Sequence, residues 1–471
     1  MGTPTIYPMG VTIYNPEKCF NGYTLFQARG EGATLIDMNG GVVNHWHHFD
    51  GFPNKLLPGG YVMGNRSERS KMYGWQDNLD LCQVDWDGNI VWCFDHWNYV
   101  EDEDIGPRWI SRQHHDYQRE GNPVGYYVPD MEAKTDGGNT LILAHHNVIN
   151  ETISLHPLLD DVVYEVDWNG KIIWEWKCNE HFDEFGFDEA AKNAIFRKPG
   201  GTPHANGWDW MHINSMSVVG PNKWYDAGDE RFHPDNLIMD GRNTNITFIV
   251  SKKTGKIVWK LGPDYSTGKE KEIGWIIGQH HAHIIPKGLP GAGNILMFDN
   301  GGLAGYGAPS PVSLDGVNNV KRGYSRVLEI DPVKMEIVWQ AQPKDLGHLQ
   351  PFNADHFYSA YISGAQRLPN GNTLITEGSD GRLFEITEEY EVVWEYISPY
   401  TGDMIDIIYR AYRYPYSYVP QIKVPKETPV LKVDNTDFRM PGAKSKEFRR
   451  FVKVEGTREL VEQTDFCLSR E

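Results

Sequence analysis

The chain has 471 residues, of which 40% are hydrophobic, and it contains 16 tryptophans and 24 tyrosines. This composition supplies enough apolar side chain for a large folded core and excludes a disordered chain. The formal net charge of −19 at pH 7 disfavours binding to nucleic acid or to an anionic membrane surface, because either would be repelled. We therefore expect a small-molecule partner, no nucleic acid and no membrane, and an anionic substrate would need a local cationic pocket.

Tryptophan marks an internal repeat. Short apolar runs end in tryptophan after Asp-, Asn- or Gly-type turns at Val42 to Trp46, Ile90 to Trp92, Ile172 to Trp174, Ile257 to Trp259, Ile337 to Trp339 and Val392 to Trp394. A second apolar run lies just upstream of each, so each unit predicts a β-hairpin. Repeated units with four strands each are typical of a β-propeller, whose blades surround a central funnel. The sequence therefore predicts an all-β fold with six blades.

The first repeat is shorter than the others. It predicts only three strands, at residues 23–26, 33–37 and 42–46. Because a complete blade also needs an inner strand, we expect a distant segment to close the ring. Long insertions interrupt several later blades and are expected to build a lid or a pocket wall. They span residues 97–136, 179–209, 224–235 and 301–323.

The repeat stops after Pro399. We therefore predict a catalytic propeller domain at residues 1–400 and a C-terminal extension packed on it at residues 401–471. Within the extension, residues 404–413 and 445–452 predict short amphipathic helices joined by a proline-rich stretch.

No segment approaches the roughly 18 uninterrupted apolar residues of a membrane-spanning helix, and the first 15 residues lack the basic start and apolar core of an export signal. We expect a cytoplasmic protein. The five cysteines are odd in number, scattered and without Cys-x-x-Cys spacing, so we predict buried free thiols rather than a disulfide framework or a thiolate zinc site. They are Cys19, Cys82, Cys93, Cys178 and Cys467. The sequence gives no indication of oligomeric state.

Histidines gather at one position of the repeat, where each precedes or begins the inner strand of a blade. They are His114, His115, His212, His280, His281, His283 and His356. Inner strands line the axis of a propeller, so His115, His212 and His281 are predicted to converge on one point although they are distant in sequence. His356 is a fourth candidate for the same place.

Converging imidazoles allow two chemistries that the residues alone do not separate. A neutral imidazole can attack an electrophile and carry a transferred group, and it can then serve in acid–base steps. Imidazole is also the commonest metal ligand, so His115, His212 and His281 are the predicted ligands if a divalent transition metal is bound. A propeller that only binds partners on its faces is a third possibility.

Arginines and amides are candidates for binding an anionic group. A planar guanidinium can bind two oxygens of a sulfuryl or phosphoryl group at once. Arg326 and Arg112, which lies beside His114, are the best placed in the repeat, and Asn214 and Asn300 could add neutral donors.

Several short segments together resemble the arylsulfotransferase-like propellers, relatives of bacterial aryl-sulfate sulfotransferase. The resemblance covers roughly residues 10–399. The matching segments are Asp209-Trp-Met-His-Ile-Asn-Ser215, Thr254-Gly-Lys-Ile-Val-Trp259, Gly278-Gln-His-His281, Gly293-Asn-Ile-Leu-Met-Phe-Asp-Asn-Gly301, Tyr324-Ser-Arg-Val-Leu-Glu329 and Ser363-Gly-Ala-Gln-Arg-Leu-Pro-Asn-Gly-Asn372.

The resemblance implies a six-bladed propeller that moves a sulfuryl group from an aryl sulfate to a phenol without a nucleotide donor and without a cofactor. It also implies a transient sulfohistidine, with other histidines and an arginine holding the sulfate oxygens. His212 and His281 match active-site histidines of the family.

Two positions depart from the family pattern. The arginine that often follows the Asp-Asn-Gly motif is replaced here by Gly302-Leu-Ala-Gly305, so Arg326 would have to serve. The inner strand expected to carry the nucleophile, at residues 359–366, contains no histidine, and His356 is the nearest.

These observations lead to one predicted function and one alternative. The predicted function is sulfuryl transfer to a phenolic acceptor, in which one histidine attacks sulfur and a second protonates the departing phenolate. The predicted catalytic residues are His212, His281, His356 and Arg326, and the predicted substrate-binding residues are His115, His280, Arg112, Asn214 and Asn300. The alternative is a metal-dependent lyase, hydrolase or oxidoreductase that acts on a small aromatic substrate.

Overall fold

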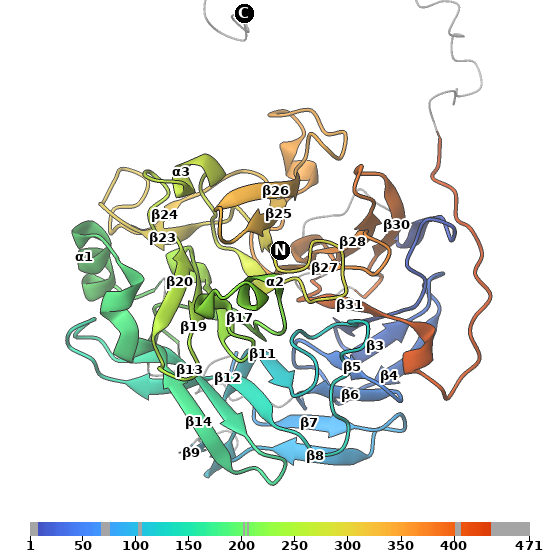
Figure 1. Cartoon of the computed structure of the whole chain (residues 1–471), viewed down its shortest axis with the longest axis horizontal. Helices are drawn as coiled ribbons and strands as arrows, with labels where there is room; N and C mark the ends of the chain where they lie inside the picture. The colour runs from blue at the N-terminus through green and yellow to red at the C-terminus, as the bar shows by residue number, and fades with distance from the viewer. Residues whose placement is uncertain are drawn as a thin grey trace, which may run out of the picture. The chain divides into compact units, whose positions relative to one another are not determined.

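The computed structural model describes residues 8–66, 76–101, 106–200, 203–204, 207–400 and 407–434. The chain divides into two units, residues 1–431 and 432–471, and nearly all described residues lie in the first. In that first unit, six mainly antiparallel sheets follow one another in a ring, in chain order from blue to red (Figure 1). The predicted six-bladed β-propeller is confirmed.

Each blade has a core of four antiparallel strands. The first and last blades each combine strands from the N-terminal and C-terminal parts of the propeller sequence. Blade 1 is β31(Ala411–Tyr414), β2(Tyr23–Ala28), β3(Gly32–Ile36) and β4(Val42–Trp46), and blade 2 is β5(Lys55–Leu57), β6(Tyr61–Gly64), β7(Leu81–Val84) and β8(Ile90–Phe94). Blade 3 is β11(Gln113–Arg119), β12(Thr140–Val148), β13(Leu158–Val166) and β14(Ile172–Lys177), with β16(Gly207–Asp209) and β15(Pro203–His204) added. Blade 4 is β17(Ile213–Val218), β18(Leu237–Gly241), β19(Ile246–Val250) and β20(Ile257–Leu261). Blade 5 is β21(His280–Ile284), β22(Ile295–Asp299), β25(Arg326–Asp331) and β26(Glu336–Ala341). Blade 6 is β27(Ser363–Arg367), β28(Thr373–Glu377), β29(Arg382–Ile386) and β30(Val392–Ile397), extended by β1(Gly10–Tyr14).

The repeat tryptophans join each blade to the next. The indole N–H of each one donates to a backbone carbonyl just after the third strand of the following blade. The six bonds are Trp46 to Asp85 at 3.1 Å, Trp92 to Trp168 at 2.9 Å, Trp174 to Lys252 at 3.1 Å, Trp259 to Pro332 at 2.8 Å, Trp339 to Glu388 at 3.1 Å and Trp394 to Met38 at 2.9 Å. The last bond returns from blade 6 to blade 1. The tryptophan repeat therefore arises because one amphipathic side chain both packs between blades and satisfies a backbone acceptor.

A distant segment closes the ring, as predicted. Strand β31 pairs with β2 in antiparallel register from Tyr414 opposite Tyr23 to Ala411 opposite Phe26. Residues 411–413 are therefore extended, and the helix predicted over 404–413 is wrong there, because pairing with the open edge of β2 outweighs the helical pattern. The propeller thus continues past residue 400, and the helix predicted at 445–452 lies outside the described residues.

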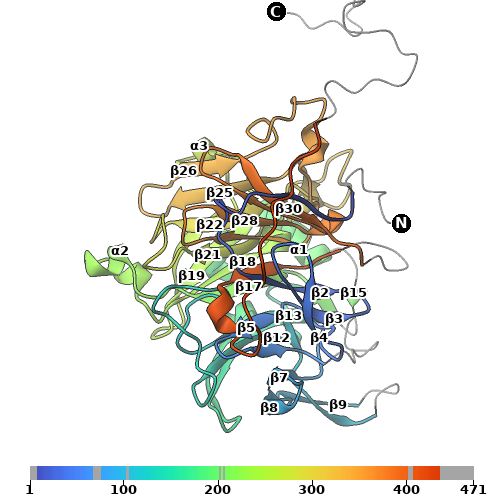
Figure 2. The ribbon, with the colours of Figure 1, turned by 90° about the vertical axis from the view of Figure 1, so that its right-hand side faces the viewer.

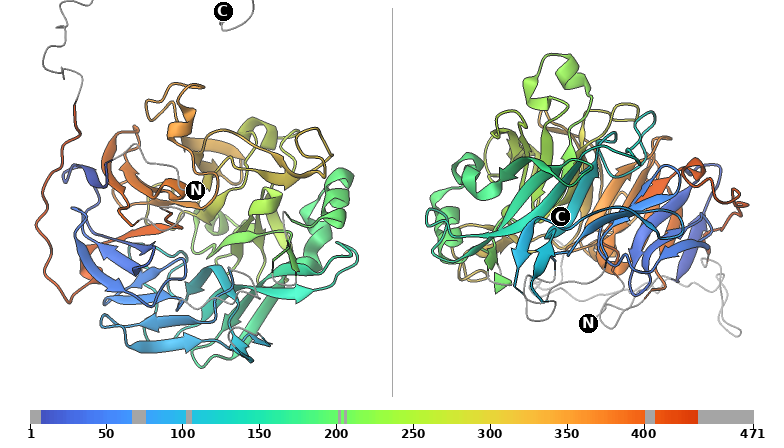
Figure 3. Two further views of the ribbon diagram at one scale, coloured as in Figure 1. Left: turned by 180° about the vertical axis from the view of Figure 1, so that it is seen from behind. Right: turned by 90° about the horizontal axis from the view of Figure 1, so that it is seen from below.

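Two of the predicted insertions carry short helices. The insertion after blade 3 holds η1(Cys178–Phe185) and α1(Glu189–Arg197), and α1 lies at the outer rim of the ring (Figure 3). Helix α2(Lys223–Asp226) and η2(Glu230–Phe232) project beside blade 4 (Figure 2). The remaining elements are the hairpins β9(Asn98–Val100) with β10(Arg108–Ile110) and β23(Ala304–Tyr306) with β24(Val317–Val320), α3(Glu270–Ile273), η3(Arg242–Thr244), η4(Ala354–His356), η5(Gly378–Asp380) and η6(Tyr416–Tyr418). No helix in these described segments is long and apolar enough to cross a membrane.

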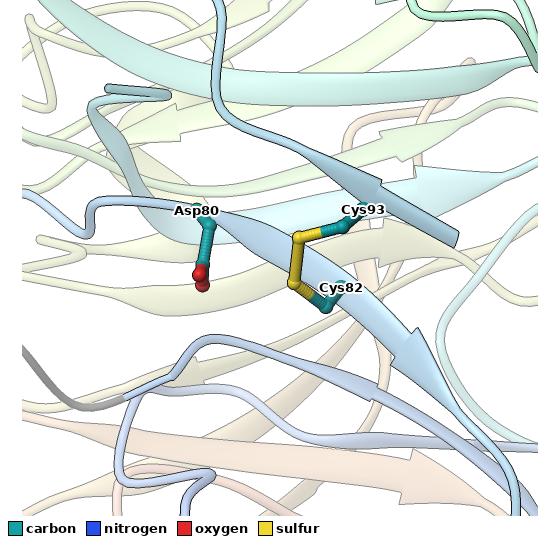
Figure 4. Close-up of side chains that lie close together, drawn as sticks. All are labelled: Asp80, Cys82 and Cys93. Atoms are coloured by element: carbon teal, nitrogen blue, oxygen red, sulfur yellow. A yellow bond between two sulfur atoms is a disulfide. The ribbon is translucent and has the colours of Figure 1, made fainter. Parts of the chain in front are cut away.

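The cysteine prediction is wrong for one pair. Cys82 and Cys93 stand opposite each other on β7 and β8 and form a disulfide, with Asp80 beside them (Figure 4). Cys-x-x-Cys spacing does not reveal this pair, because its members meet across two strands rather than along one turn. Cys19 and Cys178 are free thiols, and Cys467 lies outside the described residues.

Candidate functional site

A cavity of about 680 Å³ opens where the inner strands of blades 3 to 6 begin, and we call it the inner-strand pocket. Its wall is made by Gln27, Arg29, Gly30, Asp50, Phe52, Gln76, His115, His212, Arg242, His280, Tyr361, Ile362, Ile407 and Tyr409. Segments from every part of the ring therefore contribute to it. Three of the predicted histidines, His115, His212 and His280, line this pocket.

The backbone has the same unusual conformation at the start of four inner strands. His115, His212, His281 and Ile362 have φ values of 53°, 55°, 58° and 49°, in the left-handed region that residues with a Cβ rarely adopt. In blades 3, 4 and 5 the pairing of the first two strands is also shifted in register next to this residue. Such strain persists only where the surrounding structure enforces it, and it is frequent at functional sites.

His212 is held from behind by a carboxylate. Its Nδ1 makes a short hydrogen bond to Asp209, which precedes it by three residues on the segment that enters β17. Burial alone would raise the pKa of Asp209, but the His212 ring outweighs burial and holds that pKa below its ordinary value. Asp209 therefore stays ionised and fixes a proton on Nδ1. In the neutral ring with its proton on Nδ1, the lone pair is on Nε2, which has no hydrogen-bond partner among the described residues.

His115 stands against His212. The two ring centroids are 4.6 Å apart at an interplanar angle of 72°. The Nδ1 atom of His115 is engaged by Nδ1 of His114 at 2.7 Å, so one of the two rings donates to the other. Burial, reinforced by the His212 and His114 rings, holds the pKa of His115 well below its usual value. His115 is therefore neutral at neutral pH.

His280 lines the pocket with both ring nitrogens occupied. Its Nδ1 lies 2.8 Å from Oδ1 of Asn300, and its Nε2 accepts the backbone N–H of Ile362 at 3.3 Å. Burial, with the nearby Arg242, holds the pKa of His280 well below its usual value. Asn300 itself donates to Ser359 O at 2.8 Å. These contacts make His280 and Asn300 part of the pocket's frame.

Arg242 is a pocket residue that the sequence prediction missed. It follows β18, its backbone N–H donates to His212 O at 3.0 Å, and its guanidinium donates to Asn243 Oδ1 at 3.0 Å and Leu303 O at 3.3 Å. The run Asn236-Leu-Ile-Met-Asp-Gly-Arg242 aligns with Asn294-Ile-Leu-Met-Phe-Asp-Asn300 in the next blade. Arg242 therefore stands at the repeat position of Asn300, and this parallel could have revealed it.

Two predicted residues lie behind the pocket wall in a buried polar network. His281 accepts the backbone N–H of Ala365 at its Nδ1, at 3.3 Å, so its Nε2–H donates to Tyr412 Oη, at 3.2 Å. Burial, with Arg410, holds the pKa of His281 well below its usual value. Asn214 donates to Gln279 O at 2.8 Å, and its own carbonyl accepts from Arg410 at 3.0 Å.

Three further predicted residues lie elsewhere, and their positions do not support the predicted roles. Arg326 pairs with Asp299 at 2.7 Å and donates to the carbonyl of Trp275 at 2.9 Å, beside a separate surface cavity. His356 lies in η4, where its ring packs on His348. Arg112 is buried and pairs with Asp77 at 2.8 Å, so it orients groups behind the pocket rather than lining it.

The predicted metal set is not brought together. Among the described residues, two groups of three potential ligands come within metal-binding distance, and neither is His115, His212 and His281. One is Asp80 with the disulfide cysteines, and the other is His114, His145 and Asp161. His281 lies with Tyr412 and His283 instead.

The pocket also has an aromatic side. Phe52 and Tyr409 are stacked with ring centroids 4.2 Å apart, and Phe52 meets the His115 ring edge to face at 5.9 Å. Tyr361, Ile362 and Ile407 extend the apolar wall. A planar aromatic ring can therefore be received next to the two imidazoles.

Comparison with solved structures gives matches of low similarity. A protein of unknown function from Bacteroides caccae is 12% identical over 83% of this chain and 98% of its own, with a TM-score of 0.43. A streptogramin B lyase is 10% identical over 84% of this chain and 85% of its own, with a TM-score of 0.35. Virginiamycin B lyase from Staphylococcus aureus is 10% identical over 83% of this chain and 84% of its own, with a TM-score of 0.34. Likenesses this weak carry no argument about function, and no curated protein matches the chain significantly.

The sequence model of one family, Arylsulfotransferase (ASST), matches residues 129–408, which is more than half of the chain. This span contains Asp209, His212, Arg242 and His280, and it therefore covers part of the inner-strand pocket. The chain belongs to the arylsulfotransferase (ASST) family.

Proposed function

We propose that the protein transfers a sulfuryl group from an aryl sulfate to a phenolic acceptor through a covalent intermediate on His212. The observation that carries the proposal is the pairing of His212 with Asp209 at the wall of the inner-strand pocket. This pairing leaves the Nε2 lone pair available for attack and stabilises the positive charge that the ring acquires. Membership of a family whose transfer needs no nucleotide donor supports the same reaction.

In the first half-reaction, Nε2 of His212 forms a bond to sulfur while the bond from sulfur to the aryl oxygen breaks. The electron pair of that bond leaves on the phenolate. In the second half-reaction, the oxygen of an ionised acceptor phenol attacks sulfur, and the N–S electron pair returns to Nε2. The acceptor proton passes to solvent, so atoms and charges balance over the cycle.

The neighbours of His212 have distinct parts in this scheme. Arg242 is the cationic group that binds the sulfuryl oxygens as charge develops on them, in place of the predicted Arg326. His115, whose low pKa keeps it neutral, acts as a hydrogen-bond donor to the departing oxygen rather than as a proton donor. Phe52 and Tyr409 hold the aryl ring by stacking.

The test is a single-turnover reaction with an aryl sulfate alone. We expect one equivalent of phenol to be released with an acid-labile mass gain of one SO₃ group on the peptide that carries His212. The His212→Ala variant should lose both signals, whereas His233→Ala, at an exposed histidine outside the pocket, should keep both. Phenol release by His212→Ala, or a sulfated peptide that excludes His212, would refute the assignment.

A further inference from the structure

Behind the inner-strand pocket, three buried side-chain atoms point at one another without hydrogen-bond partners. They are Nε2 of His114, Nε2 of His145 and Oδ1 of Asp161. All three side chains are at most 1% exposed. The ligand atoms lie within 4.8 Å of one another, with 3.3 Å from His114 Nε2 and 3.8 Å from His145 Nε2 to Asp161 Oδ1. Buried polar atoms are nearly always satisfied, so this convergence requires an explanation.

The second polar atom of each side chain is already engaged. His145 Nδ1 lies 2.5 Å from Oδ1 of Asp77, His114 Nδ1 lies 2.7 Å from Nδ1 of His115, and Asp161 Oδ2 accepts the backbone N–H of Ile213 at 3.1 Å. A proton on Nδ1 of both rings leaves a lone pair on each Nε2. Three lone-pair atoms then face one another in a dry interior, which is unfavourable unless a cation lies between them.

We propose that His114, His145 and Asp161 bind one divalent transition-metal ion, with zinc as the best fit. Two imidazole nitrogens and one carboxylate oxygen are a donor set that zinc accepts, with bonds of about 2.0–2.2 Å. Ligands at these bond lengths in a tetrahedron lie roughly 3.3–3.6 Å apart. The two separations from Asp161 bracket this range closely.

The surroundings match those of a metal-binding histidine. Asp77 accepts from the far nitrogen of His145, as carboxylates commonly do behind metal ligands, and it is itself paired with Arg112 at 2.8 Å. The carboxylate of Asp209 already pairs with His212. Asp161 has no such cation: in the described segments, the only basic groups within 4 Å of it are the imidazoles of His114 and His145. A dication would therefore balance a carboxylate that otherwise lacks a permanent cationic partner.

Binding would also have two local consequences. The His114 and His145 rings are now stacked 3.5 Å apart at 13°, so the ion must tilt them apart to lie near both ring planes. A metal on Nε2 of His114 keeps the proton on its Nδ1, which then donates to His115 Nδ1. His115 is thereby left with its own proton on Nε2, at the pocket. Only this last consequence touches the proposed function, and the metal site stands without it.

The experiment is metal binding by the full-length protein. Protein freed of metal with a chelator is titrated with Zn²⁺ alone, and separately with Co²⁺, whose visible absorption reports its ligands. We expect about one equivalent of either ion to bind and Zn²⁺ to raise Tm. Asp161→Asn, which preserves the side-chain shape, and His145→Ala should each weaken binding by roughly 100-fold or more. His146→Ala is the matched control, because His146 follows His145 on β12 but pairs with Asp160.

His212→Ala separates this site from the pocket, since it removes the proposed nucleophile and none of the three ligands. Retained Zn²⁺ binding in His212→Ala together with its loss in Asp161→Asn would support the proposal even if no sulfuryl transfer were detected. Failure of the wild-type protein to bind either ion at micromolar concentration would overturn it and point to a proton shared within the cluster. Binding that His212→Ala abolishes and Asp161→Asn preserves would overturn it in favour of the pocket histidines.

Discussion

At the residue scale, the contact between Asp209 and His212 sets which ring nitrogen faces the pocket. Asp209→Asn keeps the side-chain shape but removes the charge that fixes the proton on Nδ1. We expect kcat to fall by roughly 10²–10⁴ with little change in KM for the donor, because binding does not depend on the tautomer. Steady-state kinetics measure this split. A rise in KM with unchanged kcat would contradict a positioning role, and Asp209→Glu should recover part of the rate.

Arg242 is expected to contribute mainly to the transition state. Replacing it by alanine removes the guanidinium from the wall where the sulfuryl oxygens gather charge. Loss of one such donor typically costs about 10²–10³ in kcat. Arg231→Ala is the matched control, because Arg231 pairs with Asp229 at the surface, outside the pocket. Equal activities of the two variants would show that Arg242 has no part in the chemistry.

Asp240 links stability to pH. Burial raises its pKa from 3.8 to about 7, although Ser215 and the backbone of Ala282 donate to it. The unfolded chain therefore loses this proton near pH 4 while the folded protein keeps it to about pH 7. Across that window the group lowers the free energy of unfolding as pH rises, by at most about 1.4 kcal/mol per pH unit.

Asp240→Asn should remove this part of the slope. Urea unfolding of both proteins across this pH window measures the slope. The free energy of unfolding of the wild type, relative to that of the variant, should fall as pH rises. Asp235→Asn, at a side chain that is 74% exposed, should keep the wild-type slope. A constant difference between wild type and Asp240→Asn at all pH values would contradict the shifted pKa.

The repeat predicted where the site lies better than it predicted the roles of individual residues. His115, His212 and His280 lie at the pocket because inner-strand position follows from repeat phase alone. Arg326 and His356 do not, because their orientation depends on partners such as Asp299 that periodicity does not specify. Arg242 was missed although it follows a second strand as the predicted Asn300 does, because the sequence does not show that its guanidinium reaches the pocket.

At the scale of elements, Arg413 fastens the closing strand β31 to blade 6. Its buried guanidinium pairs with Glu385 of β29 at 3.1 Å, donates to Thr24 at 2.6 Å and lies 4.5 Å from the Trp394 ring. Arg413→Ala leaves Glu385 buried without its partner, so we expect unfolding to become easier by about 3–5 kcal/mol. Lys18→Ala, which breaks an exposed pair with Glu391, should cost no more than about 1 kcal/mol.

Denaturant unfolding compares the two variants, and a second change keeps the comparison informative. Glu385→Gln in the Arg413→Ala background should restore part of the loss, because it removes the unpaired charge. Similar, small effects of Arg413→Ala and Lys18→Ala would show that the buried pair does not hold the ring closed.

The hairpin strands were predictable from the sequence. The need for a closing strand was also predictable, because the first repeat lacks an inner strand, but the segment that supplies it was not. All six tryptophan hairpins form as predicted, because alternating burial and turn residues are local signals. The sequence near residue 411 is ambiguous, because its isoleucines and tyrosines are frequent in strands but also recur at a helical spacing. Its conformation is decided by the unpaired edge of β2, which is a tertiary effect.

At the scale of the whole molecule, the net charge of −19 opposes the approach of an anionic donor. Screening shortens the reach of this field from about 30 Å at 0.01 M salt to about 8 Å at 0.15 M. We therefore expect kcat/KM for an aryl sulfate to rise with salt over this range, while kcat/KM for a neutral phenol acceptor stays nearly constant. A fall in kcat/KM for the aryl sulfate with rising salt would mean that cations around the pocket, such as Arg242 and Arg29, dominate the electrostatic field that the donor meets.

The pairing of β31 with β2 also has a consequence for biosynthesis. Strand β2 leaves the ribosome early, but the partner for its inner edge is among the last parts of the propeller to be translated. At about 5–20 residues per second the nascent chain exposes that bare edge for tens of seconds. Shielding by a chaperone during this interval would prevent two unfinished chains from pairing with each other.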